Sequence, residues 1–315
     1  MKKRFKTTQN NSLLKKALLL IISVILVSFF STKFMSSLFK SDLFTKSVIK
    51  YIINPDNEFK PNKVFSISNS IFKYSKKADD DQIDIKDANA MGDYLEDPEP
   101  NPIKNPIVYI YNTHQTEEYG KDYLEPYNIK PTVMLASYML REKLNDLGIE
   151  TIVETNEVKK VLNDRGWKYG HSYLVTRSFM ESAKKNNESL KIFIDLHRDS
   201  SIYKKTTTTI DNKKYARILF VVGLEHDNYA VNLNNANKLN EIIKKYNPSL
   251  SRGIMKKSGK GVNGKYNQDF SFNTFLIELG GQYNNISEVK NTINILADSI
   301  YDYIGGLEWK KNLIF

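Results

Sequence analysis

The 315-residue sequence contains no cysteine. This absence excludes a disulfide framework, a thiolate zinc finger, an iron–sulfur cluster and a cysteine nucleophile. Because thiolates are absent, any metal site must use His, Asp or Glu, and histidine is scarce as well. With 41% hydrophobic and 26% charged residues, the chain has the composition of a globular protein of one or two domains. The four histidines are His114, His171, His197 and His226.

The formal net charge of +10 is unevenly distributed along the chain. Residues 1–40 carry eight basic residues and no acid, residues 41–105 carry a net charge of −3, and residues 106–315 carry +5. Nucleic-acid binding needs a basic stripe with stacking aromatics in the folded part. A charge of +5 spread over the last segment is weak support for that, so we expect no nucleic-acid partner.

An apolar run follows the basic N-terminus. Residues 17–30 include no charged residue, and the uncharged stretch continues to Thr32. A helix over 17–32 would span roughly 24 Å, slightly less than the ~30 Å hydrocarbon core, and Lys15, Lys16 and Lys33 can reach the interfaces. No A-x-A site follows, which favours an uncleaved signal anchor over a cleaved signal peptide. The basic flank should stay in the cytoplasm, which places the residues after about 40 outside the membrane.

Residues 41–105 have the composition of a spacer. Asp79, Asp80 and Asp81 form an acidic run, and four prolines lie between positions 98 and 106. Proline excludes a helix there and the charge resists collapse, although the apolar residues between 42 and 74 permit some short structure. We therefore predict a basic tail and transmembrane signal anchor over 1–40, an extracytoplasmic stalk over 41–105 and a catalytic domain over 106–315.

From residue 107 onward, strand and helix patterns alternate. Short apolar runs rich in β-branched and aromatic residues are followed by segments with apolar residues at helical spacing. This alternation predicts an α/β fold with an open, mostly parallel central sheet and helices on both faces. The predicted strands are 107–111, 150–153, 191–196, 216–222 and 274–279, and the predicted helices are 132–147, 173–185, 230–246 and 286–304.

Residues with catalytic chemistry lie at the carboxyl ends of three predicted strands. His114 and Glu117 follow the strand 107–111, His197 follows the strand 191–196, and Glu278 lies near the end of 274–279. In open α/β sheets, ligands bind outside the carboxyl ends of the strands. Three distant segments would therefore bring two imidazoles and two carboxylates to one edge of the sheet.

This residue set fits a hydrolytic zinc site. A catalytic zinc ion takes three protein ligands from His and carboxylate and lowers the pKa of a bound water to about 7. We predict His114, Glu117 and His197 as ligands and Glu278 as the base that passes a proton to the leaving amine. The alternatives are capping or surface histidines, a solvated turn at Glu117, and a solvent-facing Glu278. His171 and His226 lie in polar loop contexts and are predicted to be structural or surface residues.

Several segments together resemble the stage II sporulation protein P family, a branch of the zinc-dependent N-acetylmuramoyl-L-alanine amidases. The resemblance covers roughly residues 106–306. It implies an anchored, extracytoplasmic enzyme that cuts the bond between N-acetylmuramic acid and L-alanine in peptidoglycan, with a possible endopeptidase activity on stem cross-links. The segments are 113–117 (THQTE), 195–199 (DLHRD), 216–217 (AR) before 220–223 (FVVG), 248–254 (PSLSRGI), 266–269 (YNQD) and 276–281 (LIELGG).

The resemblance also implies roles for individual residues. His114 and His197 match metal-binding histidines, and Glu278 matches a catalytic glutamate. The related amidases place a third ligand near the first long helix, where residues 131–136 contain no acid. Glu117 is therefore the candidate, with the adjacent Glu118 as the alternative. Arg177 matches an arginine that we expect to orient a substrate carboxylate, unless it is a salt-bridged surface arginine.

The family resemblance implies septal wall thinning during engulfment of a forespore, in the space between the mother-cell and forespore membranes. It also implies stage II sporulation proteins D and M as partners, with protein Q in some lineages. Two other functions remain open at this point. One is a module that binds peptidoglycan or a partner without cleaving it, and the other is a zinc carboxypeptidase acting on stem peptides.

Overall fold

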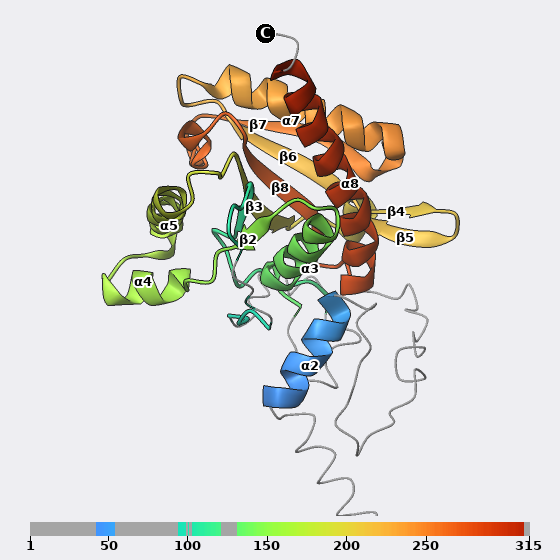
Figure 1. The fold of residues 1–315 in the computed structure, drawn as a ribbon, viewed down its shortest axis with the longest axis horizontal. Coiled ribbons are helices and arrows are strands. Elements are labelled where there is room, and N and C mark those ends of the chain that lie inside the picture. The colour runs from blue at the N-terminus through green and yellow to red at the C-terminus, as the bar shows by residue number, and fades with distance from the viewer. Residues whose placement is uncertain (1–41, 54–93, 99, 101–102, 121–130, 312–315) are drawn as a thin grey trace, which may run out of the picture.

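The computed structural model describes residues 42–53, 94–98, 100, 103–120 and 131–311 (Figure 1). The predicted signal anchor and most of the predicted stalk lie outside these residues. None of the helices in the described part is long and apolar enough to span a bilayer. The predicted anchor therefore stays a prediction.

Six strands form the central sheet, in the order β2-β1-β3-β8-β6-β7. Every neighbouring pair is parallel except β6 and β8, which are antiparallel. The prediction of an open, mostly parallel sheet is therefore confirmed. The strands are β1 (Val108–Tyr111), β2 (Thr151–Val153), β3 (Ile192–Asp199), β6 (Ile218–Gly223), β7 (Ser251–Lys257) and β8 (Thr274–Gly281).

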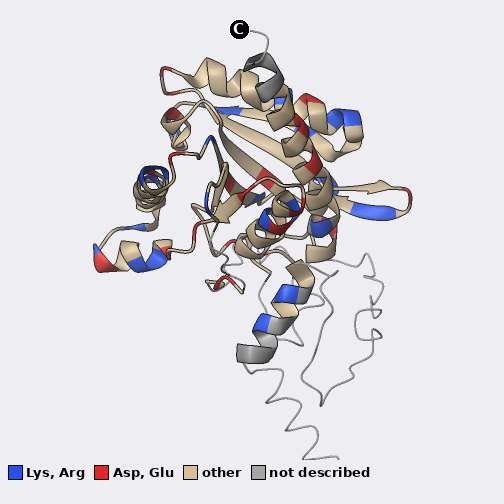
Figure 2. Ribbon diagram, viewed as in Figure 1, with Lys and Arg blue, Asp and Glu red and all other residues tan. Residues whose placement is uncertain are grey.

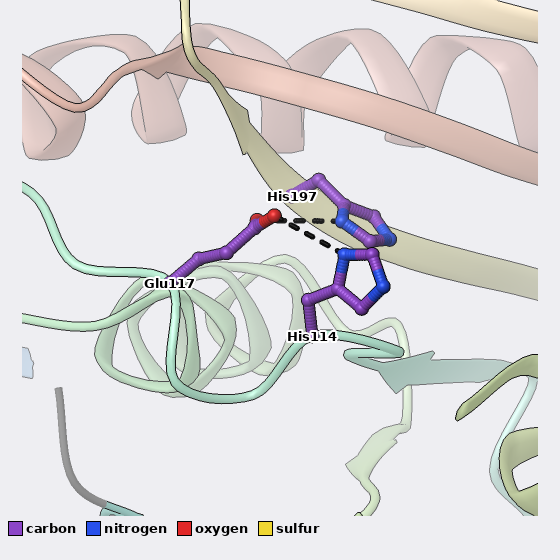
Figure 3. Close-up of side chains that lie close together, drawn as sticks. All are labelled: His114, Glu117 and His197. Carbon is purple, nitrogen blue, oxygen red and sulfur yellow. Dashed lines mark hydrogen bonds and ion pairs between the residues drawn. The ribbon is translucent and has the colours of Figure 1, made fainter. Parts of the chain in front are cut away.

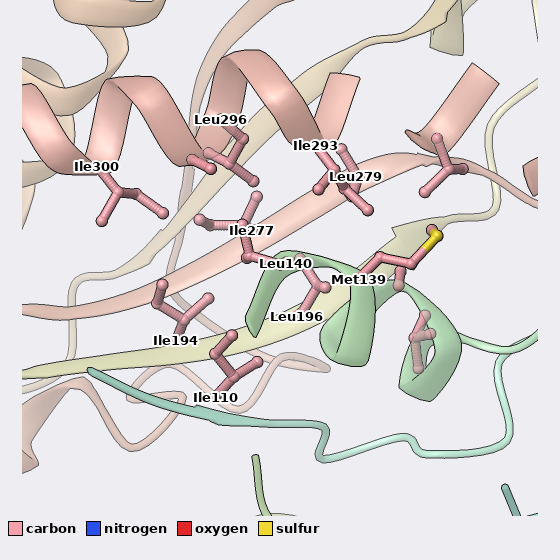
Figure 4. Packing of buried hydrophobic residues seen from close by; sticks show 14 of the residues in the cluster. Ile110, Met139, Leu140, Ile194, Leu196, Ile277, Leu279, Ile293, Leu296 and Ile300 are labelled. Atoms are coloured by element: carbon pink, nitrogen blue, oxygen red, sulfur yellow. The ribbon is translucent and has the colours of Figure 1, made fainter. Parts of the chain in front are cut away.

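Side-chain alternation divides the sheet into two apolar faces. On one face, Ile110, Ile194 and Ile277 join the main core with residues of α3 (Val133–Asp146), α7 (Tyr229–Tyr246) and α8 (Ile286–Lys311), as Figure 4 shows for part of the cluster. On the other face, Tyr109 and Phe193 pack against Met180 of α5 (Ser172–Asn186). Helices thus cover both faces, as the alternating pattern predicts.

Several short elements were not predicted. A hairpin, β4 (Thr207–Ile210) and β5 (Lys213–Ala216), projects from the body of the molecule beside α8 (Figure 1). Its turn residues Asp211 and Asn212 both have positive φ, at 48° and 60°, which Asp and Asn tolerate better than most residues. The other elements are α4 (Val158–Asp164), α6 (Tyr203–Thr206), η4 (Tyr169–His171), η5 (Pro248–Leu250) and η6 (Gln268–Phe270).

The structure differs from the predicted stalk at both ends of that segment. The helix α2 (Asp42–Ile53) buries Val48, Ile49, Ile52 and Ile53 in the main core, next to α3. Burial of these side chains removes apolar surface from water, which stabilises the packed helix. A solvated spacer would have no such buried face.

The C-terminal part of the predicted stalk also contacts α3. The Tyr138 hydroxyl donates a hydrogen bond to the Leu95 carbonyl (2.8 Å), and the buried Arg141 guanidinium forms an ion pair with Asp97. Residues 42–53 and 94–98 therefore pack against the domain that was predicted to begin at 106.

Basic and acidic residues are interspersed along the helices α3 and α4 (Figure 2). On the hairpin, Lys213 and Lys214 are exposed on β5. Red segments also lie near the middle of the sheet in Figure 2, where β3 and β8 carry acidic residues.

Candidate metal and active site

The loop after β1 is fixed to β3 before it reaches His114. The Asn112 side-chain amide donates to the Leu196 carbonyl (2.6 Å). The Thr113 backbone N–H donates to Asp195 Oδ1 (2.9 Å), and its hydroxyl donates to Asp195 Oδ2 (2.7 Å). These buried bonds place His114 at the carboxyl end of β1, directly beside the end of β3.

A tight turn then brings Glu117 back toward His114. The Glu117 N–H donates to the His114 carbonyl (3.1 Å), and the Glu117 carbonyl accepts from the Val133 N–H (2.9 Å) at the start of α3. The Glu117 Oε2 atom also accepts a hydrogen bond from the Arg198 N–H (3.1 Å). Glu117 is thus held between the β1 loop and β3.

His197 comes from β3 and points away from the main core. Its neighbours Ile194 and Leu196 belong to that core, so strand alternation sends Asp195 and His197 to the opposite face. Thr113 and the Thr176 hydroxyl of α5 lie 3.1 Å apart over this face. The face that carries His197 is therefore the one that α5 partly covers.

His114, Glu117 and His197 converge on one point (Figure 3). Each offers one ligand atom, and these atoms all lie within 4.8 Å of one another. His114 Nδ1 lies 3.2 Å from Glu117 Oε1, and His197 Nδ1 lies 3.3 Å from Glu117 Oε2. The two imidazole rings meet edge to face, with centroids 5.0 Å apart. The cluster opens to solvent through His114, whose side chain is 23% exposed.

The second nitrogen of His197 faces a buried carboxylate. His197 Nε2 lies 2.9 Å from Asp195 Oδ1, which is an ion-pair distance. Burial alone would lower the pKa of His197, but Asp195 and Glu117 raise it well above its usual range. Asp195 therefore orients the ring and increases its basicity, as carboxylates do for metal-binding histidines.

Glu117 and Glu118 have different surroundings although they are adjacent in sequence. Burial would raise the pKa of Glu117, but His197 and His114 hold it well below its usual range. The Glu118 backbone pairs with Thr132 in a β-bridge, and its Oε1 atom is buried with no hydrogen-bond partner among the described residues. The structure therefore places Glu117, and not Glu118, with the two imidazoles.

Glu278 lies next to the cluster on the neighbouring strand. In the parallel pairing of β3 and β8, Glu278 is the partner of His197, and Ile277 and Leu279 on either side belong to the main core. Burial is the main cause that raises the pKa of Glu278 to about 8, with Glu117 and Asp199 adding to it. Glu278 Oε2 is buried and has no hydrogen-bond partner in the described part of the chain. A carboxyl group with a free oxygen thus lies on the same face as His197.

Arg177 lies on α5 and has two carboxylate partners. Its Nε donates to Glu181 Oε1 (3.0 Å) and its Nη1 donates to Asp269 Oδ1 (2.9 Å), while the guanidinium lies over the Phe270 ring. These contacts do not include the cluster residues. The expected role in orienting a substrate carboxylate stays a prediction.

The other two histidines remain apart from the cluster. His171 Nδ1 lies 3.1 Å from the Lys168 carbonyl, and its ring lies beside Trp167. His226 follows β6, whose direction is opposite to that of β8. Its carboxyl end therefore lies at the opposite edge of the sheet from Glu278, which is why His226 does not join the site.

Two kinds of residue at the site were missed from the sequence. Asp195 is one. It could have been recognised from the sequence because it is an acid two positions before His197, and therefore on the same face of a buried strand. The other is a pair of tyrosines beside His114. Tyr169 stacks on the His114 ring with centroids 4.7 Å apart, and Tyr173 meets it edge to face at 5.9 Å. Only the dense aromatic residues between 167 and 173 could have indicated them.

The donor set of the cluster fits a zinc ion. Two imidazole nitrogens and one carboxylate oxygen are the ligands of many catalytic zinc sites. The low pKa keeps Glu117 ionised, and the Asp195 carboxylate beside His197 Nε2 leaves Nδ1 to face the centre of the cluster. The partial exposure of the His114 side chain gives solvent access to the cluster. This edge of the sheet can therefore hold a metal ion with a carboxyl group beside it.

Comparison with known proteins identifies related chains. The profile of the family described as "Stage II sporulation protein P (SpoIIP)" matches residues 36–301. The protein "Stage II sporulation protein P" of Bacillus subtilis (strain 168) is 37% identical over 198 residues, which cover 61% of this chain and 49% of the relative. The matched region thus spans about half the length of that curated relative.

Two solved structures show a low overall similarity. One is an N-acetylmuramoyl-L-alanine amidase from Clostridium difficile 630, with 15% identity and a TM-score of 0.39 over 64% of this chain and 97% of the other. The second is the CwlD amidase from Clostridioides difficile in complex with the GerS lipoprotein. It has 16% identity and a TM-score of 0.38, and the match covers 63% of this chain and 98% of the other.

Proposed function

This chain belongs to the stage II sporulation protein P family, and we propose that it is a zinc-dependent peptidoglycan hydrolase. The bond cut is the amide between N-acetylmuramic acid and L-alanine. The observation that carries the proposal is the convergence of His114, Glu117 and His197 on one point, with Glu278 on the adjacent strand. Family membership supports the sporulation context of the substrate.

His114, Glu117 and His197 would hold the metal. A bound zinc ion supplies a Lewis acid that polarises the scissile carbonyl and activates water as the nucleophile. His197 is kept in place by Asp195, and Glu117 is kept in place by the Arg198 N–H. The ligands are therefore positioned before substrate arrives, which reduces the cost of organising the site.

Glu278 is the proton carrier in this proposal. The oxygen of water bonds to the carbonyl carbon, and Glu278 Oε2 takes the proton that water releases. The carbon–nitrogen bond then breaks, and Glu278 returns the proton to the nitrogen of the leaving L-alanine. The products are a lactyl carboxylic acid on the sugar and a free amino group on the peptide, so atoms and charge balance.

We place the enzyme outside the cytoplasm, held by the predicted anchor of residues 17–32. Its site of action would be the space between the mother-cell and forespore membranes, with stage II sporulation proteins D and M as partners. The sequence resemblance and family membership support this placement. The packing of α2 against α3 would keep the domain close to the end of such an anchor.

The test is digestion of purified peptidoglycan by the full chain, with and without a chelator. We expect new lactyl carboxyl groups and peptide amino termini in equal amounts, loss of both on chelation, and recovery with Zn²⁺. Full activity after complete metal removal would refute the metal-dependent mechanism.

The products distinguish the competing functions. Release of terminal D-alanine would indicate a carboxypeptidase, and split cross-links without lactyl groups would indicate an endopeptidase. Retention of the protein on peptidoglycan with no cleavage, in the presence of zinc, would indicate a binding module. As a matched surface control, a Glu188→Gln variant, at an exposed position in the turn after α5, should digest the wall at the wild-type rate.

A further inference from the structure

The backbone around Arg252 is held firmly at the start of β7. The pairing of β7 with β6 shifts register between Ile218 and Phe220, and Gly253 has a φ of 81°. The Ser251 hydroxyl donates to Asn240 Oδ1 (2.6 Å) and accepts from the Gly253 N–H (2.9 Å). These bonds fix the residues on both sides of Arg252, so the direction of its side chain is set by the fold.

Arg252 reaches from β7 to the end of β3. Its Nη1 donates to Asp199 Oδ2 at 2.5 Å, and Asp199 Oδ1 accepts from the Ser201 N–H (2.9 Å). β6 and β8 lie between β7 and β3 in the sheet, so the side chain spans the ends of both strands. The pair is mostly buried, with 11% of the Arg252 side chain and 15% of the Asp199 side chain exposed.

This ion pair lies beside the candidate active site. Asp199 is two positions after His197 on β3. On β6, Leu219 is the partner of Glu278 of β8, and it lies in the register shift opposite Arg252 and Gly253 of β7. Asp199 pairs with Gly281 of β8, three residues after Glu278. The tyrosines that contact His114 come from η4 and α5. Arg252 comes from β7, which is the edge strand at the other end of the sheet from β2.

Arg252 differs from other arginines of this region in its free donors. Arg217 uses three nitrogens on the carbonyls of Ser249, Ser251 and Lys205, which are structural partners. Arg177 already pairs with two carboxylates. In the described part of the chain, the Arg252 side chain makes a single hydrogen bond, through Nη1. A planar guanidinium held at one corner can still receive a carboxylate on its remaining N–H groups.

We propose that Arg252 is a specificity residue that binds a free carboxylate of the substrate's peptide. The peptide is the part of peptidoglycan that carries free carboxylates, and it leaves as the amine when the muramoyl amide is cut. Asp199, two positions after His197, holds the guanidinium at the end of β3, so Arg252 would fix the peptide at the edge of the sheet that carries Glu278. This inference rests on the proposed amidase function and names a substrate group that it recognises.

The test uses two synthetic muramoyl dipeptides that differ in one group. The second amino acid carries either a free carboxylate or the corresponding carboxamide. We expect wild-type kcat/KM to be about tenfold higher for the acid, as for a charge-assisted hydrogen bond. The Arg252→Gln variant should cleave the two substrates at nearly equal rates, because the substitution should lower kcat/KM for the acid and leave that for the carboxamide unchanged. Arg252→Lys should retain part of the preference.

Two other arginines serve as comparisons. Arg165→Gln, at an exposed position after α4, should keep the wild-type preference and rate. Arg177→Gln tests the alternative assignment, in which the preference for the acid depends on the arginine of α5 and not on Arg252. The proposal is overturned if Arg252→Gln keeps the acid-to-amide ratio, if it slows both substrates equally, or if Arg177→Gln removes the preference instead.

A binding measurement separates this proposal from the amidase function. Wild-type protein that cleaves neither substrate would refute the amidase function. Calorimetric titration of the chelator-treated protein with the acid and amide forms of the free L-alanyl dipeptide then decides the role of Arg252. Tighter binding of the acid, lost in Arg252→Gln, supports it, and equal binding of both forms refutes it.

A folding control is needed because Arg252→Gln leaves Asp199 buried without its partner, which destabilises proteins. The double variant Asp199→Asn, Arg252→Gln removes both charges and should unfold at a temperature nearer to that of the wild type. It should show the same loss of preference as the single variant. A double variant that is folded and retains the preference would overturn the proposal.

Discussion

The β1 loop and the end of β8 each bring one glutamate to the same edge of the sheet, and the two glutamates differ in their electrostatics. Glu117 lies between two imidazoles, which hold its pKa well below the usual range. Glu278 is desolvated next to other acids, and its pKa rises to about 8. Identical side chains thus acquire opposite pKa shifts from their surroundings alone, and these shifts suit the proposed roles of Glu117 as a metal ligand and Glu278 as a proton carrier.

The largest expected effect concerns metal binding by the loop. Glu117→Gln should reduce zinc affinity by more than the ~10–100-fold typical of changes in groups that only support a ligand. Glu118→Gln is the matched control, because the adjacent carboxyl lies outside the cluster. Metal content after dialysis, measured by mass spectrometry, checks both variants. Zinc loss in Glu118→Gln with retention in Glu117→Gln would reverse the assignment.

The next effect concerns the proton carrier. Glu278→Gln should lower kcat by roughly 10²–10⁴-fold, because the amide cannot accept the proton from water. Zinc content should stay at the wild-type level, since Glu278 is outside the ligand cluster. Steady-state hydrolysis of a muramoyl peptide and metal analysis of the same sample provide the measurement. A variant that retains wild-type kcat would remove Glu278 from the mechanism.

A smaller effect is expected at the residue that orients His197. Asp195→Asn should weaken zinc binding about 10–100-fold, because the carboxylate 2.9 Å from Nε2 is lost. Competition with a chromogenic chelator measures the affinity. Excess zinc should restore most of the activity of Asp195→Asn but little of that of Glu278→Gln. Equal recovery of the two variants would contradict the division of roles.

The smallest effect is on stability and depends on pH. In the metal-free protein, the pKa of Glu278 rises from 4.5 to about 8 on folding. Between these values the unfolded chain binds fewer protons than the folded one, so the free energy of unfolding falls as pH increases. Glu278→Gln removes this term and should be more stable than wild type at pH 8, by on the order of 1 kcal/mol or more.

Urea unfolding in the presence of a chelator tests this expectation. The two proteins should have similar stability below pH 4.5, where Glu278 is protonated in both states, and should diverge as pH rises to 8. A constant difference across this range would show that the effect comes from packing rather than from the charge of Glu278.

Prediction from the sequence was most accurate for the buried strands. The runs at 107–111, 191–196 and 274–279 are apolar and rich in β-branched residues, so they predicted β1, β3 and β8 and placed His114, His197 and Glu278 at their ends. β7 was not predicted because it is an edge strand, in which Met255 and Lys256 are exposed and Arg252 and Lys257 are half-buried. Its apolar signal is therefore weak, although it supplies Arg252.

The first part of the predicted stalk, where α2 lies, shows a similar limit. Proline and acidic residues gave the segment 41–105 the composition of a spacer, and the apolar residues of α2 had no partner that could be identified from the sequence. The burial of Val48 and Ile52 depends on a surface of α3, which is distant in the chain. Composition averages over such a segment and does not detect a docked helix.

The sequence alone determined the α/β class, the candidate residues and their placement at strand ends, because side-chain periodicity and strand composition are local properties. Tertiary structure decided which of two adjacent glutamates faces the imidazoles, that Asp195 supports His197, and that Arg252 extends across two strands to Asp199. These outcomes depend on strand order, register and the direction of a turn, which arise from contacts between residues tens of positions apart. The contrasting pKa values of Glu117 and Glu278 have the same origin, since desolvation and neighbouring charge exist only in the folded chain.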